Sequence, residues 1–391
     1  MAEGTRPREL ALEILLDYDR RDAYVNKLLR NRLSHSGLEW RDRALVNELV
    51  QGTVRMKLAI DYALSLFSRR PIERLHRKVL WLFRLGAYQV LFTSVPDWAA
   101  CDVSTELARL TMSQGQASFI NAVLRALSAG KKDIRYPDPA RDPAGYLEAR
   151  YSHPRWLAEM WIGEMGFTRA EALCAADNRP TMTSIRCNLE RTTREELASR
   201  LAERGLKVKY SALVPEGLLV KGGGPLEETG EYQKGFFSFQ DEGAMLVSRS
   251  LNLTPGLSVL DMCAAPGGKA NHIAELMGNR GRVVALDINE GRLKMVEESA
   301  ARLGNRIIET RTMDALGASR ELGEEFDRVL IDAPCSGLGT LSRRPDARWR
   351  KRPGDPARLS RIQERLMAEG EALLKRGGLL VYSTCTISEA E

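Results

Sequence analysis

The sequence predicts a protein of several domains: an all-helical N-terminal domain, a small α/β module, and a C-terminal Rossmann-like α/β domain with a parallel sheet. Its 391 residues exceed the usual size of one domain. Apolar residues recur at helical spacing through the first third of the chain, and short apolar runs alternate with helical segments in the last third. These changes of pattern place the domains at residues 1–145, 146–235 and 236–391.

The N-terminal domain is expected to be a bundle of helices. Its first helix begins near Thr5, a residue that can cap it, and Ala11, Ile14 and Leu15 lie on one face. The run 79–85 is apolar on nearly every side, as expected of a helix surrounded by others. Helices are predicted after the first at residues 41–55, 59–68, 79–92, 101–110 and 117–127.

The middle module begins after a stretch in which Pro137 and Pro139 prevent a continuous helix. Thr193 and Glu196 have the spacing of a capping box at the start of a helix. Helices are predicted at residues 156–164 and 193–204, and strands at 183–188, 206–210 and 217–220.

The third domain alternates strands with helices, which implies right-handed crossovers and a parallel, doubly wound sheet. In such a sheet ligands bind at the carboxyl ends of the strands, so functional residues are expected in the loops that follow them. Strands are predicted at residues 258–261, 282–287, 306–312, 328–332 and 378–383, and helices at 269–277, 292–303 and 356–374.

Composition excludes several classes of protein. The net charge of +6 and the pI of about 9.0 fit a polyanionic partner or an ordinary solvated surface. No apolar stretch is long enough to span a bilayer, and the N-terminus lacks the apolar segment of a signal peptide. The six cysteines and four histidines show no metal-ligand spacing. We therefore expect no metal, no membrane and a cytoplasmic location.

A loop rich in small residues follows the first strand of the third domain. It reads Asp261-Met262-Cys263-Ala264-Ala265-Pro266-Gly267-Gly268-Lys269. Such residues let backbone amides approach a ligand closely, so we expect a cofactor to bind here. The spacing matches neither the dinucleotide fingerprint nor the phosphate-binding loop.

Two aspartates indicate which cofactor binds. Asp287 ends the second strand, where a carboxylate holds the ribose hydroxyls of nucleoside cofactors. Asp314 follows the third strand, where it can accept a hydrogen bond from an adenine amino group. Because no phosphate loop is present, S-adenosyl-L-methionine is the expected cofactor. The alternative is that both aspartates only cap the helices that follow.

Two cysteines at strand ends indicate the reaction. Cys335 follows Asp332 in Asp-Ala-Pro-Cys-Ser-Gly, and Cys385 lies in Tyr-Ser-Thr-Cys-Thr. A thiolate that adds to carbon 6 of a pyrimidine activates carbon 5 toward a methyl sulfonium, and a second group then helps to remove the carbon 5 proton. Asp332 can hydrogen-bond the polar edge of the base. The alternative is that both cysteines are small packing residues, and spacing alone does not say which would attack.

These blocks resemble, in order, the signature motifs of the RsmB-type RNA cytosine-5 methyltransferases, which act on bacterial small-subunit ribosomal RNA. The resemblance covers essentially the whole chain and includes Arg343-Arg344-Pro345-Asp346 with Arg348-Trp349. It implies that Cys385 is the nucleophile, that Cys335 assists product release, and that Asp332 and Lys269 belong to the catalytic site. It implies cofactor contacts from Cys263, Ala264, Ala265, Pro266, Gly267, Gly268, Lys269, Asp287, Asp314 and Asp332.

The resemblance also implies a substrate. Residues 5–130 resemble the NusB-like RNA-binding domain of such enzymes, so small-subunit (16S) ribosomal RNA is the expected partner of a monomeric enzyme. Two alternatives stay open: a transfer-RNA methyltransferase with the same chemistry, and a non-catalytic RNA-binding scaffold. A basic segment also suits RNA, although such a run is often a solvated loop. Its residues are Arg343, Arg344, Arg348, Trp349, Arg350, Lys351 and Arg352.

The end of the sequence departs from the family's pattern. The family's catalytic domain continues after the fifth strand with two further strands, which complete a seven-stranded sheet. This sequence stops at Glu391, so we expect the C-terminal strands to be missing from it.

Overall fold

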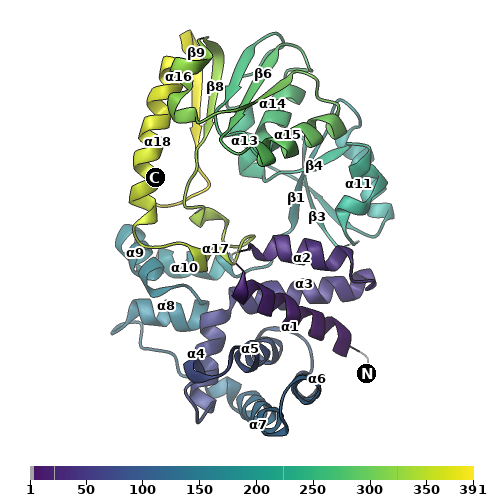
Figure 1. Ribbon diagram of the computed structural model, residues 1–391, viewed down its shortest axis with the longest axis vertical. Coiled ribbons are helices and arrows are strands. Elements are labelled where there is room, and N and C mark those ends of the chain that lie inside the picture. The colour runs from purple at the N-terminus through teal and green to yellow at the C-terminus, as the bar shows by residue number, and fades with distance from the viewer. Residues whose placement is uncertain (1–3, 22, 223, 324) are drawn as a thin grey trace. The chain divides into compact units, whose positions relative to one another are not determined.

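The computed structural model describes residues 4–21, 23–222, 224–323 and 325–391, and it divides into two compact units (Figure 1). The first unit runs to Pro180 and includes Leu338–Pro353. The second comprises Thr181–Gly337 and Gly354–Glu391. This division differs from the three predicted domains, because residues 146–180 join the helical unit and residues 181–235 join the unit with the parallel sheet.

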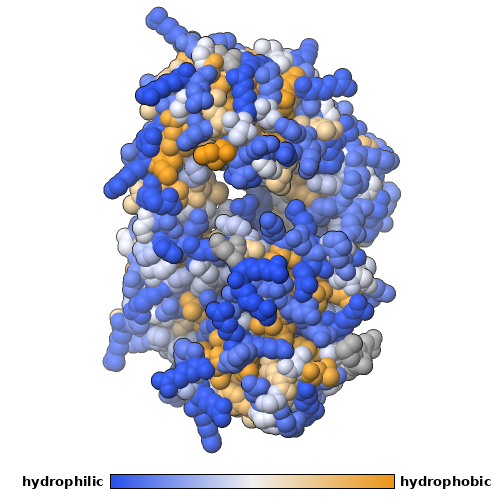
Figure 2. Space-filling model, viewed as in Figure 1, coloured by the Kyte–Doolittle hydropathy of each residue, from blue (hydrophilic) through white to orange (hydrophobic). Residues whose placement is uncertain are grey.

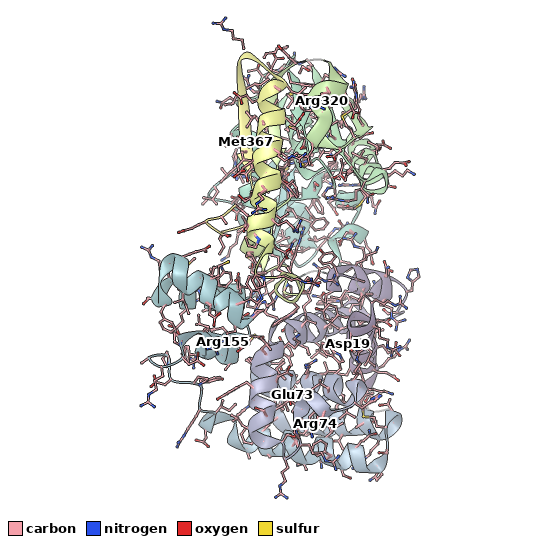
Figure 3. All side chains as sticks on the ribbon, turned by 60° about the vertical axis from the view of Figure 1, so that its left-hand side comes forward. Asp19, Glu73, Arg74, Arg155, Arg320 and Met367 are labelled. Atoms are coloured by element: carbon pink, nitrogen blue, oxygen red, sulfur yellow. The ribbon has the colours of Figure 1, made fainter. Side chains whose placement is uncertain are left out.

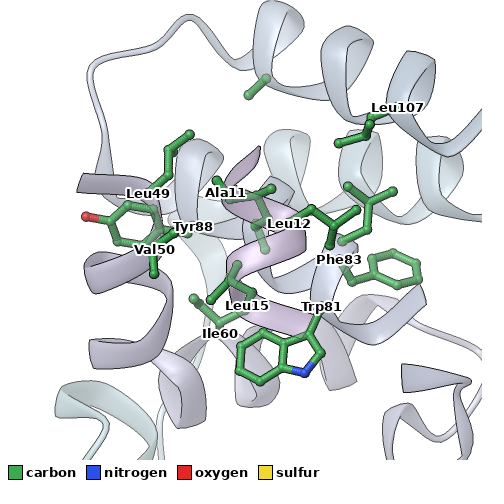
Figure 4. Packing of buried hydrophobic residues seen from close by; sticks show 14 of the residues in the cluster. Ala11, Leu12, Leu15, Leu49, Val50, Ile60, Trp81, Phe83, Tyr88 and Leu107 are labelled. Atoms are coloured by element: carbon green, nitrogen blue, oxygen red, sulfur yellow. The ribbon is translucent and has the colours of Figure 1, made fainter. Parts of the chain in front are cut away.

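Every described element of the first unit is helical, as predicted. Helix α5 lies at its centre and contacts α1, α3, α4, α6 and α7. Figure 4 shows Trp81, Phe83 and Tyr88 of α5 among apolar side chains of the neighbouring helices. The elements are α1 Thr5–Arg20, α2 Val25–Ser34, α3 Trp40–Arg55, α4 Lys57–Phe67, η1 Ile72–Arg74, α5 Arg77–Phe92, α6 Asp97–Thr111, α7 Gln114–Gly130, η2 Lys131–Asp133, α8 Pro143–Tyr151, α9 Arg155–Met165, α10 Phe167–Asp177, η5 Leu338–Thr340 and α17 Ala347–Arg350.

Thr5 does not cap α1, so that prediction is wrong. The N-cap residue is Gly4, with φ of 90°, and Thr5 is the first helical residue. The Thr5 side chain is fully buried, and its hydroxyl donates to the carboxylate of Glu106 at 3.5 Å. The apolar face is as expected, since Ile14 and Leu15 are buried in the bundle.

The second unit contains a four-stranded antiparallel sheet in the order β2-β3-β1-β4. The predicted boundary at residue 235 cuts through this sheet, because β4 pairs with β1 through Ile185 and Phe239. Half of the predicted capping box forms: the Glu196 amide donates to the Thr193 hydroxyl at 3.1 Å, whereas the Glu196 carboxylate accepts from Thr192 and Arg200. The elements are β1 Thr183–Cys187, α11 Arg194–Glu203, β2 Lys207–Tyr210, β3 Gly217–Lys221, η3 Leu226–Glu228, α12 Gly230–Gln233 and β4 Phe237–Phe239.

A five-stranded parallel sheet in the order β7-β6-β5-β8-β9 forms the rest of the second unit. The predicted bounds of β5 and β6 are confirmed, and the remaining strands differ by a few residues at one end. The elements are α13 Glu242–Arg249, β5 Ser258–Asp261, α14 Gly268–Leu276, β6 Arg282–Asp287, α15 Glu290–Leu303, β7 Ile308–Thr312, η4 Ala315–Gly317, α16 Ala318–Leu322, β8 Phe326–Asp332, α18 Asp355–Ala372 and β9 Leu374–Ser383.

Both faces of the parallel sheet are covered. Val259 and Val283 pack with residues of α14 and α15, whereas Leu260 and Val284, the next residues along, pack with α16 and α18. Alternation of side chains along a strand produces these two cores. Because both faces are covered, the strand ends are the places where this sheet can present functional groups.

Figure 2 shows hydrophilic side chains over most of the face in view, with smaller hydrophobic patches.

Buried charges connect the antiparallel sheet to α14. The Arg186 guanidinium, with no exposed side-chain surface, donates to both carboxylate oxygens of Glu275 at 3.0 and 2.7 Å. Arg186 also donates to the carbonyl of Gly268 at 2.9 Å, in the first turn of α14. Arg186 therefore joins both ends of α14, the helix that carries Lys269, to the antiparallel sheet. Among the described residues, no helix is both long and apolar enough to cross a membrane.

Candidate active site

The carboxyl ends of the five parallel strands bring the predicted site residues to one edge of the sheet. The small-residue loop follows β5, Asp287 ends β6 and Asp314 follows β7. Asp332 ends β8, and Cys385 lies two residues beyond β9. Parallel pairing alone explains this convergence, because all five strands end on the same side.

The loop after β5 is a tight turn that ends at the N-terminus of α14. The Ala264 amide donates to Leu286 at 2.8 Å, and the Gly267 amide donates to Ala264 at 2.7 Å. Gly267 has φ of 101°, and a Cβ there would lie 3.0 Å from the Val296 backbone, so only glycine fits. No side chain caps α14, and the space around Gly268 is open. The first amides of α14 can therefore receive an anionic group.

Asp287 is almost fully buried at the end of β6. One of its oxygens accepts from the Asn289 amide at 2.9 Å, and the other lies 3.3 Å from Arg292. Arg292 also donates to the Ala265 carbonyl, so this arginine of α15 joins Asp287 to the loop. Arg292 was not predicted from the sequence, because no local pattern shows that α15 turns back toward the loop.

The capping alternative holds for one of the two aspartates. Asp314 is exposed and accepts from the Leu316 amide at 3.0 Å, which makes it the N-cap of η4. Asp287 caps no helix, since Asn289 is the N-cap of α15. Asp287 is therefore the better placed of the two to bind a ligand.

Lys269 and Asp332 form an ion pair within the site. The Lys269 ammonium lies 2.6 Å from one Asp332 oxygen, and the Ser383 hydroxyl donates to the other at 3.0 Å. One helix and two strands contribute to this contact, because Lys269 lies in the first turn of α14, Asp332 ends β8 and Ser383 ends β9. The pair holds the Asp332 carboxylate beside the two cysteine loops.

Asp261 is a buried carboxyl whose sequence pattern predicted no role. Asp261 lies at the end of the central strand β5 and has no exposed surface. Among the described residues, neither of its carboxyl oxygens has a donor that meets the distance and angle of a hydrogen bond. Burial, together with the negative charge of Asp332, raises the pKa of Asp261 to about 7, although Lys269 and the Cys263 amide partly oppose this. The site therefore contains a carboxyl that titrates near neutral pH.

The two predicted cysteines meet. Asp332 pairs with Ser383 in the register of β8 and β9, so the loops that follow lie side by side. The Cys335 and Cys385 sulfur atoms are 3.3 Å apart, and the Cys385 amide lies 3.3 Å from the Cys335 sulfur. Cys385 is exposed and Cys335 is half-buried. Contact with the Cys385 thiol, and then burial, raise the pKa of Cys335.

Cys263, the third cysteine of this region, is unsuited to nucleophilic chemistry. Burial, and then the nearby carboxylates of Asp261 and Asp287, raise its pKa to about 12. Its thiol is therefore protonated at neutral pH. This fits the expectation that Cys263 lies in the cofactor loop without attacking the substrate.

The basic segment predicted to bind RNA is partly buried within the first unit. Arg348 has no exposed surface and donates to the Ser152 carbonyl at 3.0 Å and to Asn178 at 3.1 Å. The Trp349 indole donates to the Val54 carbonyl at 2.8 Å, and Arg350 donates to Ala23 at 2.6 Å. The prediction of RNA contact is therefore wrong for Arg348, whose guanidinium satisfies buried carbonyl groups. It stays a prediction for the exposed or half-buried Arg343, Arg344, Trp349, Arg350, Lys351 and Arg352.

Comparison with known proteins identifies the family. The model of 16S rRNA methyltransferase RsmB/F matches residues 248–391, that of the NusB family residues 5–129, and that of the ferredoxin-like domain of RsmF/B-like methyltransferases residues 153–227. The probable ribosomal RNA small subunit methyltransferase B of Bacillus subtilis (strain 168) is 40% identical over 390 residues, which cover 99% of this chain and 86% of that protein. The chain belongs to the RsmB/RsmF family of 16S rRNA methyltransferases. The resemblance predicted from the motifs is thus confirmed.

Other family members and solved structures agree. The corresponding protein of Synechocystis is 36% identical over 388 residues, covering 98% of this chain and 86% of that protein. The crystal structure of PH0851 matches with a TM-score of 0.81 and 27% identity, covering all of this chain and 88% of that one. A methyltransferase homolog protein from Pyrococcus horikoshii matches with a TM-score of 0.57 and 30% identity, over 65% of this chain and 79% of that one.

The donor set of the site fits adenosylmethionine. Asp287 is a buried carboxylate at the end of β6. The first amides of α14 are open to an anion, because no side chain caps this helix and the space around Gly268 is empty of protein atoms. These are the groups that a ribose and an amino-acid carboxylate require. Among the described residues, no group of three or more histidine, cysteine, aspartate or glutamate side chains is placed to hold a metal ion.

Proposed function

We propose that this protein methylates carbon 5 of a cytosine in small-subunit ribosomal RNA, with S-adenosyl-L-methionine as methyl donor. The observation that carries the proposal is the pair of thiols 3.3 Å apart at the ends of β8 and β9, where Asp332 ends the same β8. A base that reaches this edge meets a nucleophile, a second thiol and a carboxylate together. Cys385 is exposed, which argues against the alternative that it is a small packing residue.

The cofactor would be held by groups at the ends of three strands. Asp287 is placed to accept from its ribose hydroxyls, the first amides of α14 to bind its carboxylate, and Asp314 to receive the adenine amino group. When bound, adenosylmethionine supplies a methyl group that is activated by a positively charged sulfur. A relative named NSun6 from Pyrococcus horikoshii was solved with SFG, an adenosylmethionine analogue, and matches 61% of this chain with a TM-score of 0.56 and 26% identity.

The thiols have separate tasks in this scheme. The thiolate of Cys385 adds to carbon 6 of the cytosine, and the displaced electrons of the ring double bond make carbon 5 a nucleophile toward the methyl group that the cofactor would supply, the donor sulfur keeping the electron pair of the broken sulfur–methyl bond. The thiolate of Cys335 then takes the carbon 5 proton, the ring double bond re-forms, and Cys385 leaves as a thiolate. While Cys385 is bonded to carbon 6 it has no ionisable thiol, which removes the first cause of the raised pKa of Cys335.

Asp332 and Lys269 orient the base. An ionised carboxylate can accept a hydrogen bond from the cytosine amino group, which uracil lacks. Lys269, 2.6 Å away, holds the Asp332 carboxylate in position beside the base. The substrate class is supported by the names of the relatives, which are ribosomal RNA small subunit methyltransferases. A monomeric state and a cytoplasmic location remain predictions.

Methyl transfer to purified RNA tests the proposal. Unmethylated small-subunit ribosomal RNA and transfer RNA are each incubated with labelled adenosylmethionine and wild type, Cys385→Ala or Cys101→Ala, the last a control thiol in the first unit. We expect 5-methylcytidine in the ribosomal RNA with wild type and Cys101→Ala, and none with Cys385→Ala. Methylation of transfer RNA instead would identify the first alternative. A wild-type protein that shows no calorimetric binding of adenosylmethionine would support the non-catalytic scaffold.

A further inference from the structure

The first unit contains a pocket that the proposed mechanism does not use. It has a volume of about 480 Å³, within the usual range for small-ligand sites. The end of α1, the start of α4, η1, the first half of α5 and α17 contribute to its walls. Every one of these elements belongs to the first unit.

The walls of this pocket carry a surplus of positive charge. Five cations line it, namely Arg21, Lys57, Arg77, Arg84 and Arg350, against two acidic residues. The acidic residues are Asp19 and Glu73, which are labelled in Figure 3. Asp61 and Asp346, which lie behind the walls, pair with Arg84 and Arg350, so five cations meet four carboxylates and one positive charge is left over.

Ion pairs within the unit engage only some of these cations. Arg84 donates to both oxygens of Asp61 at 2.8 and 2.7 Å, Arg77 lies 3.3 Å from Asp19, and Arg350 lies 3.9 Å from Asp346. In the part of the chain that the structure describes, the ammonium of Lys57 meets no hydrogen-bond acceptor. Burial, and then the charge of Arg84, lower the pKa of Lys57. An anion in the pocket would offset this repulsion and could accept a hydrogen bond from the Lys57 ammonium.

Aromatic rings hold three of the cations in place. Lys57 lies 4.2 Å from the Trp349 ring centroid, Arg84 4.6 Å from that of Trp81, and Arg350 4.4 Å from that of Tyr24. Cation–π contacts keep the full charge of a side chain while they restrict its position. The positive charges are thus fixed before a ligand arrives, which lowers the entropy lost on binding.

We propose that this pocket binds a phosphate group of the RNA substrate. The inference rests on the proposed function for the identity of the polyanion, because phosphates are the anions that every RNA presents. A positively charged pocket contacts the backbone without reading sequence, so its task is to position the RNA. Arg350, which was predicted to contact RNA, lines this pocket. Lys57 and Arg77 line it as well, although the sequence predicted no RNA contact for them.

Salt-dependent RNA binding tests the inference. Wild type, Lys57→Gln, Arg77→Gln and Arg125→Gln are titrated with a fluorescent fragment of unmethylated small-subunit ribosomal RNA at several salt concentrations. Arg125 is the matched control, because it is also an exposed arginine in an ion pair, 2.8 Å from Asp102, in the same unit and outside the pocket. Arg77 is 70% exposed, so its replacement should leave the fold intact even if that of Lys57 does not.

We expect the two pocket variants to bind about tenfold more weakly at low salt, the effect of removing one charged hydrogen bond. The slope of log affinity against log salt should fall by about 0.7 for each phosphate of single-stranded RNA that the variant no longer neutralises. Arg125→Gln should match wild type. Wild-type affinity and slope in Arg77→Gln would overturn the inference. Methyl transfer by wild type is measured in parallel, so a failure of the proposed function is recognised separately from a failure of the pocket.

Discussion

The pKa of Asp261 leads to a prediction about stability. Its pKa rises from an ordinary 3.8 to about 7 in the folded protein, so the folded state binds the proton more tightly than the unfolded chain. Stability from this group is therefore greatest at acidic pH and is lost as the pH rises through 7. This difference between the unfolded and the folded pKa corresponds to about 4 kcal/mol of stability, of which about 3 kcal/mol is lost between pH 5 and pH 8.5.

Asp261→Asn isolates this contribution, because asparagine has nearly the same shape and does not titrate. The free energy of unfolding is measured from urea denaturation, followed by circular dichroism, at pH 5 and pH 8.5 for both proteins. We expect wild type to lose about 3 kcal/mol more than the variant over this interval. Asp102→Asn, a change at an exposed site of α6, should behave as wild type. Parallel losses in wild type and Asp261→Asn would refute the account of Asp261.

Two further substitutions test the cofactor site and the buried basic segment. Asp287→Asn should weaken adenosylmethionine binding about 10- to 100-fold by calorimetry, because a charged acceptor for two hydroxyls becomes a neutral one; an unchanged affinity would contradict its role. Arg348→Met should lower the free energy of unfolding by about 3–5 kcal/mol, because Asp177 and the carbonyl groups that now accept from Arg348 would lose their buried cation. Tryptophan fluorescence reports this change, since all six tryptophans lie in the first unit. The exposed Arg344→Met should change it by less than about 0.5 kcal/mol, and equal effects would refute the assigned role of Arg348.

Much of the parallel sheet could be predicted from the sequence because its signals are local. Strands β5 and β6 are short apolar runs that end at an aspartate and a loop, so their bounds are set by residues within the run. The convergence of Cys335 and Cys385 also followed, because parallel strands end at one edge. The short strand β4 was missed, since three residues are too few to show a period.

Features that depend on distant partners could not be predicted. The charge of Arg348 led to a prediction of RNA contact, and only the folded unit brings Ser152 and Asn178 to it. Thr5 has the chemistry of a cap, but its side chain turns inward toward α6. The raised pKa of Asp261 depends on Asp332, which lies on a neighbouring strand 71 residues later in the sequence.

The covalent adduct between enzyme and RNA tests the central claim most directly. A Cys335→Ala protein can form the bond from Cys385 to carbon 6 but lacks the thiol that helps to break it. Incubated with adenosylmethionine and unmethylated small-subunit ribosomal RNA, it should give an adduct that survives a denaturing gel, and mass spectrometry should locate the nucleotide on Cys385. The double variant Cys335→Ala/Cys385→Ala should give none. An adduct that persists in the double variant, or its absence from Cys335→Ala, would contradict the assignment of the two thiols.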